Sequence, residues 1–94
     1  MDIWSFRHKA LQRFFETGNV RGLNPAWVPK LRRMLTAIAA AETIEDLTGV
    51  PGWKAHELAG DRKGVWALWV TGNWRLTFRC EEDAVHDLDL EDYH

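Results

Sequence analysis

Apolar residues in the first part of the chain recur at helical spacing. Leu11, Phe14 and Phe15 occupy positions i, i+3 and i+4, which places their side chains on one face of a helix. Gly18 follows at the position where helices commonly end in a left-handed residue. The pattern therefore predicts a helix over residues 8–17. A short extended segment is predicted before it, from the β-prone residues Ile3, Trp4 and Phe6.

A second helical pattern follows a glycine-containing loop. Asn24 and Pro25 form the pair expected at a helix start, because asparagine caps free amide groups and proline has no amide to leave unpaired. Pro29 falls near the first turn, where its missing amide costs little, and is the alternative start of this helix. Alanine-rich residues extend the predicted helix to about position 41. The apolar residues of this helix keep helical spacing: Val28, Leu31, Leu35 and Ile38.

The spacing of apolar residues changes from helical to alternating after Gly49-Val50-Pro51-Gly52, a cluster of helix breakers. Residues 65–70 are apolar on both faces, as in a central strand. Thr71-Gly72-Asn73 is typical of a tight hairpin turn. Residues 74–80 then alternate, and a further turn leads to a last strand over residues 84–90. The polar face of the 74–80 strand carries Arg75, Thr77 and Arg79.

This order of elements predicts an α+β fold, in which two N-terminal helices pack on a mostly antiparallel curved sheet whose other face is open to solvent. A chain of 94 residues matches one domain, so residues 1–94 are predicted to form a single domain. The chain has no apolar run near the ~18 residues of a membrane span, and its opening shows no signal-peptide pattern. We therefore expect a cytoplasmic protein with no membrane partner.

Charge is divided unevenly along the chain. Residues 1–79 contain all twelve lysines and arginines but seven acidic residues, a net charge of +5, whereas residues 80–94 contain seven acidic residues and no lysine or arginine. The overall charge of −2 thus hides a basic body, and such a body is a hint of contact with a polyanion. A solvated surface with an acidic end is the commoner cause of such a division.

Two basic segments are candidates for contacts with an anionic ligand. Arg75 and Arg79 are four residues apart on one predicted strand, so their side chains share a face at a separation of ~13 Å. Arg62 and Lys63 lie in a short loop between two glycines, which suits contact with a phosphate backbone. From spacing alone, a solvated strand face and an ordinary turn explain these residues as well.

Titratable residues gather at the C-terminus, which reads Glu91-Asp92-Tyr93-His94. Histidine titrates near neutral pH and suits a general acid or base, and an adjacent carboxylate favours its protonated form. His56, close before the basic loop, is a further candidate. A frayed terminus and a half-buried histidine are the ordinary explanations. The single cysteine excludes an internal disulfide, and no spacing resembles a metal site, so neither a metal nor another cofactor is expected.

Three motifs occur together in the second half of the chain. They are Leu58-x-Gly60-Asp61-Arg62-x-Gly64-x-Trp66, Asn73-Trp74-Arg75-Leu76-Thr77-Phe78 and the ending Glu91-Asp92-Tyr93-His94. In this order and spacing, the chain resembles the HigB-type toxins of the RelE/ParE superfamily, also called plasmid maintenance system killer proteins, over essentially its whole length. The resemblance implies a microbial-ribonuclease-like fold, ribosome-dependent cleavage of messenger RNA, and inhibition by a helix-turn-helix antitoxin of the HigA type.

The resemblance also implies roles for individual residues. Arg75 matches the arginine that contacts the phosphate or the transition state. Asp92, Tyr93 and His94 match the catalytic ending of the family, with His94 as general acid or base. His56 matches the histidine before the basic loop. The residues expected to contact RNA or the ribosome are Arg62, Lys63, Arg79 and His56.

Metal-free cleavage of RNA needs a base for the 2′-hydroxyl, a cation for the charge that develops around phosphorus, and an acid for the leaving oxygen. His94 and Arg75, with a partner from the ending or His56, are expected to supply these groups and to leave a 2′,3′-cyclic phosphate. Where some family members have a catalytic lysine, this chain has Ala59. The alternatives are therefore a weak nuclease, a non-catalytic inhibitor like the ParE relatives, and an interaction module that binds operator DNA only with its antitoxin.

Overall fold

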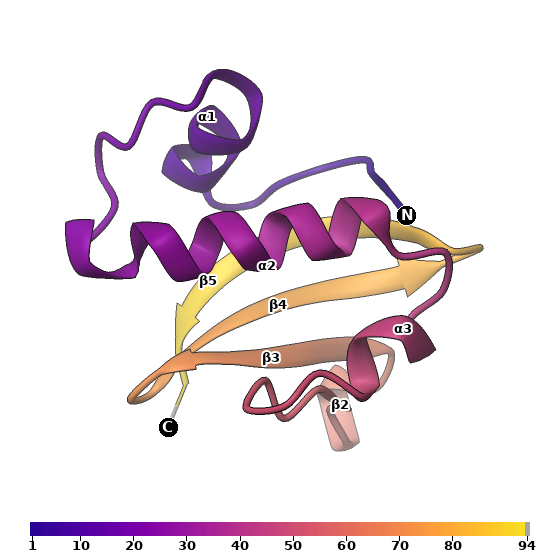
Figure 1. Cartoon of the computed structure of the whole chain (residues 1–94). Coiled ribbons are helices and arrows are strands. Elements are labelled where there is room, and N and C mark those ends of the chain that lie inside the picture. Colours follow the sequence, from indigo (N-terminus) through magenta and orange to yellow (C-terminus); the bar gives the residue numbers. More distant parts are fainter. Residues whose placement is uncertain (94) are drawn as a thin grey trace.

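The fold is seen in a computed structural model of the chain, in which residues 1–93 are described (Figure 1). The strand order of the sheet in these residues is β1-β5-β4-β3-β2. β1 runs parallel to β5, and all other neighbouring strands are antiparallel. No helix of residues 1–93 is both long and apolar enough to cross a bilayer. The elements are β1 (Asp2–Ile3), α1 (Lys9–Thr17), the 3₁₀ turn η1 (Pro25–Trp27), α2 (Val28–Ala40), α3 (Glu45–Thr48), β2 (His56–Glu57), the 3₁₀ turn η2 (Gly60–Arg62), β3 (Val65–Thr71), β4 (Trp74–Glu81) and β5 (Ala84–Asp92).

The two N-terminal helices begin and end where their sequences provide caps. The His8 side chain accepts a hydrogen bond at 3.1 Å from an amide of the first turn of α1, and Gly18 ends this helix with a φ of 79°. The Asn24 side chain accepts a hydrogen bond at 2.9 Å from the amide two residues further on. This second cap opens η1, so the α-helix itself begins at Val28, next to the alternative start Pro29, rather than directly after the asparagine.

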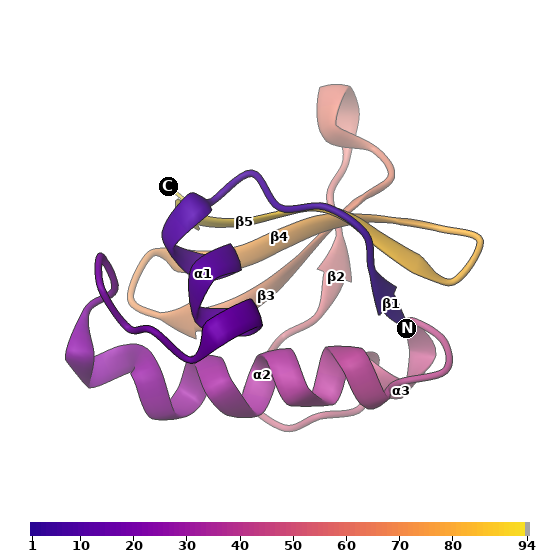
Figure 2. The same cartoon turned by 90° about the horizontal axis from the view of Figure 1, so that it is seen from above.

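The core lies between the helices and one face of the sheet. α2 crosses that face and α1 lies beside it (Figures 1 and 2). The short helical turn between β2 and β3 projects from the opposite side of the sheet (Figure 2). The buried apolar residues of this core on α2 and on the three long strands are Val28, Leu31, Met34, Leu35, Ile38, Leu68, Val70, Leu76, Phe78, Val85, Leu88 and Leu90. The predicted α+β fold, with two N-terminal helices on a mostly antiparallel sheet, is therefore confirmed.

Several local features differ from the sequence prediction. The helix α3 and the edge strand β2 are not predicted, because four and two residues are too few to show a periodic pattern. α3 is a single turn held by the Asp46 carboxylate, which accepts a hydrogen bond from the Glu42 amide at 2.8 Å. β5 extends to Asp92 rather than to residue 90, since its last residues continue to pair with β4. The second face of the sheet is not fully open to solvent, because Thr77 on that face is only 2% exposed.

The turn between β4 and β5 adopts a conformation that its residues disfavour. Glu82 and Asp83 have φ angles of 53° and 58°, the left-handed region that tight hairpins require and that asparagine and glycine adopt most readily. We expect the variant Glu82→Asn/Asp83→Gly to be more stable by about 1 kcal/mol and to melt roughly 4–8 °C higher in circular dichroism. Glu81→Gly, within β4, should melt lower than the wild type. Identical melting of the double variant and the wild type would contradict the prediction.

Candidate active site

Arg75, on β4, lies beside Tyr93, which directly follows β5. The Cζ atom of Arg75 is 5.8 Å from the centroid of the Tyr93 ring. The Nη1 atom of Arg75 donates hydrogen bonds to the carbonyls of Gly72 and Trp74, at 3.1 and 3.2 Å. The Tyr93 amide donates to the Asn73 carbonyl at 2.6 Å. The turn between β3 and β4 therefore anchors both residues, and Arg75 forms no ion pair within residues 1–93.

The predicted catalytic ending continues from β5. In the antiparallel register of β4 and β5, Glu91 lies opposite Arg75 and Asp92 lies opposite Trp74. This pairing places Asp92 and Tyr93 at the same end of the sheet as Arg75. Asp92 is exposed, and His94 lies outside the described residues. Strand pairing thus brings three of the four predicted catalytic residues to one end of the sheet, namely Arg75, Asp92 and Tyr93.

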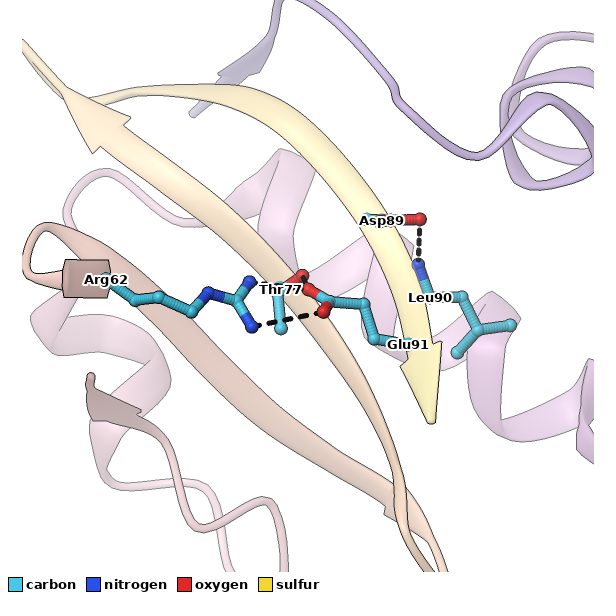
Figure 3. A network of polar contacts seen from close by, with 5 residues as sticks. All are labelled: Arg62, Thr77, Asp89, Leu90 and Glu91. Atoms are coloured by element: carbon cyan, nitrogen blue, oxygen red, sulfur yellow. Dashed lines mark hydrogen bonds and ion pairs between the residues drawn. The ribbon is translucent and has the colours of Figure 1, made fainter. Parts of the chain in front are cut away.

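Arg62 and Glu91, which are 29 residues apart in the sequence, form an ion pair with two hydrogen bonds (Figure 3). The Nη1 and Nη2 atoms of Arg62 lie 3.1 and 2.7 Å from the two carboxylate oxygens of Glu91. The hydroxyl of Thr77 also donates to this carboxylate. In Figure 3, the Arg62 side chain reaches from η2 toward Glu91 and lies over β4. The network therefore ties the η2 turn to β5 and covers Thr77.

The ion pair shifts the pKa values of both partners. The hydrogen bond from Arg62 holds the pKa of Glu91 below its ordinary value, although partial burial acts in the opposite direction, and the Thr77 hydroxyl adds to the lowering. The hydrogen bond to Glu91 raises the pKa of Arg62. Glu91 is therefore ionised at neutral pH and does not serve as a proton donor, and the Arg62 guanidinium already has an anionic partner.

A cleft of about 230 Å³ lies beside this network. Its charged lining consists of three guanidinium groups and two carboxylates, from Arg7, Arg62, Arg79, Asp61 and Asp87. The Nε atom of Arg79 also lies 3.3 Å from a carboxylate oxygen of Glu81, and both side chains are well exposed. Two of the arginines predicted to contact RNA, Arg62 and Arg79, are thus paired with carboxylates from the acidic end of the chain.

Arg7 belongs to this cleft and is not found by the sequence analysis. β5 bulges opposite Phe78, where Asp87 and Leu88 occupy the space of one residue and Asp87 has a φ of 56°. The Leu88 carbonyl accepts a hydrogen bond from the Arg7 amide at 2.9 Å, and the Leu88 amide donates to the Ser5 carbonyl at 3.0 Å. The segment before α1 is therefore bonded to the bulge, which carries Arg7 to the cleft. The N-terminal run Phe6-Arg7-His8-Lys9-x-Leu11 also fits the family pattern, but it does not show that Arg7 lines the cleft.

His56 and Lys63 lie on the segment that leads into β3. His56 is exposed on β2, and its Nδ1 atom is 2.8 Å from the Lys54 carbonyl oxygen. Ala59 and Lys63 flank η2, and both are exposed. Within residues 1–93, no hydrogen bond or ion pair joins His56 or Lys63 to Arg75. In the same residues, no group of three or more His, Cys, Asp or Glu side chains is arranged to hold a metal ion.

Comparisons with known proteins match nearly the whole chain. Residues 4–94 match the family model described as the RelE-like toxin of the type II toxin-antitoxin system HigB. The chain is 39% identical over 92 residues to the endoribonuclease HigB of Proteus vulgaris, covering 98% of this chain and 99% of that protein. It is 30% identical over 87 residues to an uncharacterized protein of Haemophilus influenzae, covering 92% and 86% of the two chains. The crystal structure of a YafQ mutant from E. coli has a similar fold, with a TM-score of 0.58 and 16% identity over 97% of this chain and 93% of that chain.

Proposed function

Because this chain belongs to the HigB-like family of RelE-like toxins of type II toxin-antitoxin systems, we propose that it is an endoribonuclease that cuts messenger RNA on the ribosome and so inhibits translation and growth. The observation that carries the proposal is the position of Arg75. Its guanidinium has no carboxylate partner within residues 1–93 and lies beside Tyr93, in the ending that follows β5. A cation that is not already neutralised is what the charge developing on a phosphoryl group requires.

In the proposed reaction, the 2′-oxygen attacks the adjacent phosphorus and the 5′-oxygen leaves, which gives a 2′,3′-cyclic phosphate and a 5′-hydroxyl. Arg75 stabilises the negative charge on the non-bridging oxygens. His94 accepts or donates a proton, with Asp92 or Tyr93 as its partner. Glu91 takes no part as an acid, since its carboxylate is held in the ionised form. Side chains handle both the charge and the protons, so the proposed reaction needs no metal or other cofactor.

The exposed basic residues supply the proposed contacts with RNA and the ribosome. Lys63 is exposed after η2, so we assign it the role of the lysine that some relatives carry at the position of Ala59. Arg79 and His56 contribute further contacts from β4 and β2. Arg62 contributes N–H donors rather than net charge, because the Glu91 carboxylate balances its guanidinium and holds it in place. The ribosome positions the strand, which explains how so few groups suffice for cleavage.

The toxin class implies an antitoxin partner. We assign this role to a helix-turn-helix antitoxin of the HigA type, encoded beside the toxin. The helix-turn-helix belongs to the antitoxin, so we expect the toxin chain to bind operator DNA only as part of the complex with its antitoxin. A gel-shift experiment with the separated partners and with their complex tests this assignment.

The nuclease proposal is tested by adding the purified chain to a translation reaction and mapping the 5′ ends of the message. We expect cuts only in messages that ribosomes are translating, with 5′-hydroxyl and 2′,3′-cyclic phosphate ends. The same message without ribosomes is the control and should stay intact. Growth arrest with intact ribosome-bound message would contradict the nuclease. It would favour a non-catalytic, ParE-like inhibitor, the alternative suggested by Ala59 at the position where some relatives have a catalytic lysine.

A further inference from the structure

A second group of cations surrounds Trp69, near the end of the sheet where β3 turns into β4. Lys30, on α2, has its Nζ atom 4.3 Å from the centroid of the Trp69 ring. Lys54, in the loop before β2, has its Nζ atom 5.2 Å from the same ring. The negative face of an indole attracts ammonium groups, so one ring holds two lysines that come from different parts of the fold.

No carboxylate neutralises either ammonium group within residues 1–93. The Nζ atom of Lys30 donates a hydrogen bond to the Val70 carbonyl at 2.6 Å, which fixes the ammonium against the end of β3. Burial and, to a lesser extent, the neighbouring charge of Arg33 lower the pKa of Lys30. An anion bound at Lys30 would offset both effects, because it would replace the lost hydration of the ammonium and screen its repulsion by Arg33.

The space beside Lys30 and Trp69 is open to a ligand. A cleft of about 390 Å³ adjoins these two residues, and its lining contains one charged residue, Lys30. The lining residues are Ala26, Trp27, Lys30, Trp69, Val70 and Thr71. The cleft beside Arg62 is different, because Asp61 and Asp87 contribute carboxylates to its lining. An anionic ligand in this cleft would therefore meet the Lys30 ammonium without competing acidic side chains in the lining.

The Trp69 group adjoins the candidate catalytic arginine. The Nε1 atom of Trp69 donates a hydrogen bond to the Gly72 carbonyl at 2.9 Å, and the Nη1 atom of Arg75 donates to the same oxygen at 3.1 Å. One carbonyl of the β3–β4 turn thus positions both side chains. A strand of RNA whose scissile phosphate lies at Arg75 would therefore have a neighbouring phosphate within reach of the two lysines.

We propose that Lys30 and Lys54, held by Trp69, form a subsite for a backbone phosphate of RNA beside the phosphate that is attacked at Arg75. The identity of the ligand rests on the proposed function, whereas the preference for an anion rests on the two unneutralised ammonium groups. The phosphate belongs either to the message or to the RNA of the ribosome. The geometry and charge of the subsite are the same for both sources, so separate binding measurements distinguish them.

The first measurement is the affinity for a 2′-O-methyl oligoribonucleotide, which keeps the phosphates and lacks the attacking hydroxyl. The variants are Lys30→Gln, Lys54→Gln and the double variant, and fluorescence anisotropy is recorded over a series of salt concentrations. For the double variant we expect binding about tenfold weaker and a slope of log affinity against log salt that is smaller by about 0.7, the loss of one phosphate contact. Trp69→Leu should weaken binding as well, while Trp69→Phe keeps an aromatic face and should largely restore it.

The matched control is Lys9→Gln, which removes the same charge from an exposed position on α1 and should bind like the wild type. The second measurement is sedimentation with ribosomes. Weaker sedimentation of the lysine variants with unchanged oligoribonucleotide affinity would place the phosphate in ribosomal RNA. Variants that bind both probes like the wild type would overturn the subsite.

The outcomes separate the subsite from the proposed function. If the wild type cuts no ribosome-bound message but its oligoribonucleotide affinity still depends on the two lysines, the nuclease proposal fails and the phosphate subsite stands. Suppose instead that the wild type and the double variant cut message equally well at low protein concentration and bind both probes equally. The subsite alone is then wrong. Melting temperatures close to that of the wild type show that the variants are folded.

Discussion

Replacing Arg75 by alanine is expected to lower the rate of cleavage of ribosome-bound message by about 100- to 1000-fold. Its guanidinium is the proposed partner of the charge that develops on the phosphoryl oxygens, and it is not neutralised by a carboxylate within residues 1–93. Single-turnover cleavage of a defined message on stalled ribosomes measures the rate. The fold should be little affected, because within residues 1–93 the Arg75 side chain donates only to two carbonyls at the β3–β4 turn.

Two further arginine variants make this test specific. Arg75→Lys keeps the charge but loses the planar pair of donors, so it should recover only part of the rate. Arg21→Ala removes the same charge from an exposed loop position and should cut message like the wild type. The assignment of the catalytic groups fails if Arg75→Ala and His94→Ala both cut ribosome-bound message at the rate of the wild type.

Replacing Glu91 by alanine is expected to lower the free energy of unfolding by about 2 kcal/mol and the melting temperature by roughly 10 °C. The change removes both hydrogen bonds to Arg62 and leaves the hydroxyl of Thr77, which is 2% exposed, without its carboxylate acceptor. Urea unfolding measures the loss. Glu81→Ala is the matched control, because it breaks the exposed pair with Arg79 and should lower the free energy of unfolding by less than about 1 kcal/mol.

The Glu91 network also predicts a dependence of stability on pH. The folded pKa of Glu91 lies below its ordinary value of 4.5, so its contribution is fully present above about pH 4.5 and is lost as the pH falls through the folded pKa. Arg62 stays protonated throughout, since its pKa is raised. The difference in free energy of unfolding between the wild type and Glu91→Gln should therefore shrink between about pH 7 and pH 3. A difference of the same size at both pH values would contradict the role of the ionised carboxylate.

Much of the fold follows from local spacing. The positions of Leu11, Phe14 and Gly18 predict α1 because helical periodicity and a left-handed cap are properties of neighbouring residues. Alternation along β4 likewise predicts that Arg75 and Thr77 share one face. The order of strands is only partly predictable, because the parallel pairing of β1 with β5 joins the two ends of the chain.

The candidate site is less predictable than the fold. Sequence motifs point to Arg75 and to the ending, and strand register explains why these residues meet. The sequence motifs do not show that Arg62 is held by Glu91, or that Arg7 enters the same cleft. These contacts span many residues of sequence, and they form because η2 and the segment before α1 both bond to β5 at positions without a local pattern.

The sequence by itself determines that the chain has a basic body of +5 and an acidic end, and the spacing of its apolar residues predicts two helices and a sheet. Only the tertiary structure decides which charges cancel. The acidic end neutralises Arg62 and Arg79, whereas Arg75, Lys30 and Lys54 have no carboxylate partner within residues 1–93. The physical reason is that Coulomb attraction depends on distance in space, and strand pairing sets that distance independently of separation along the chain.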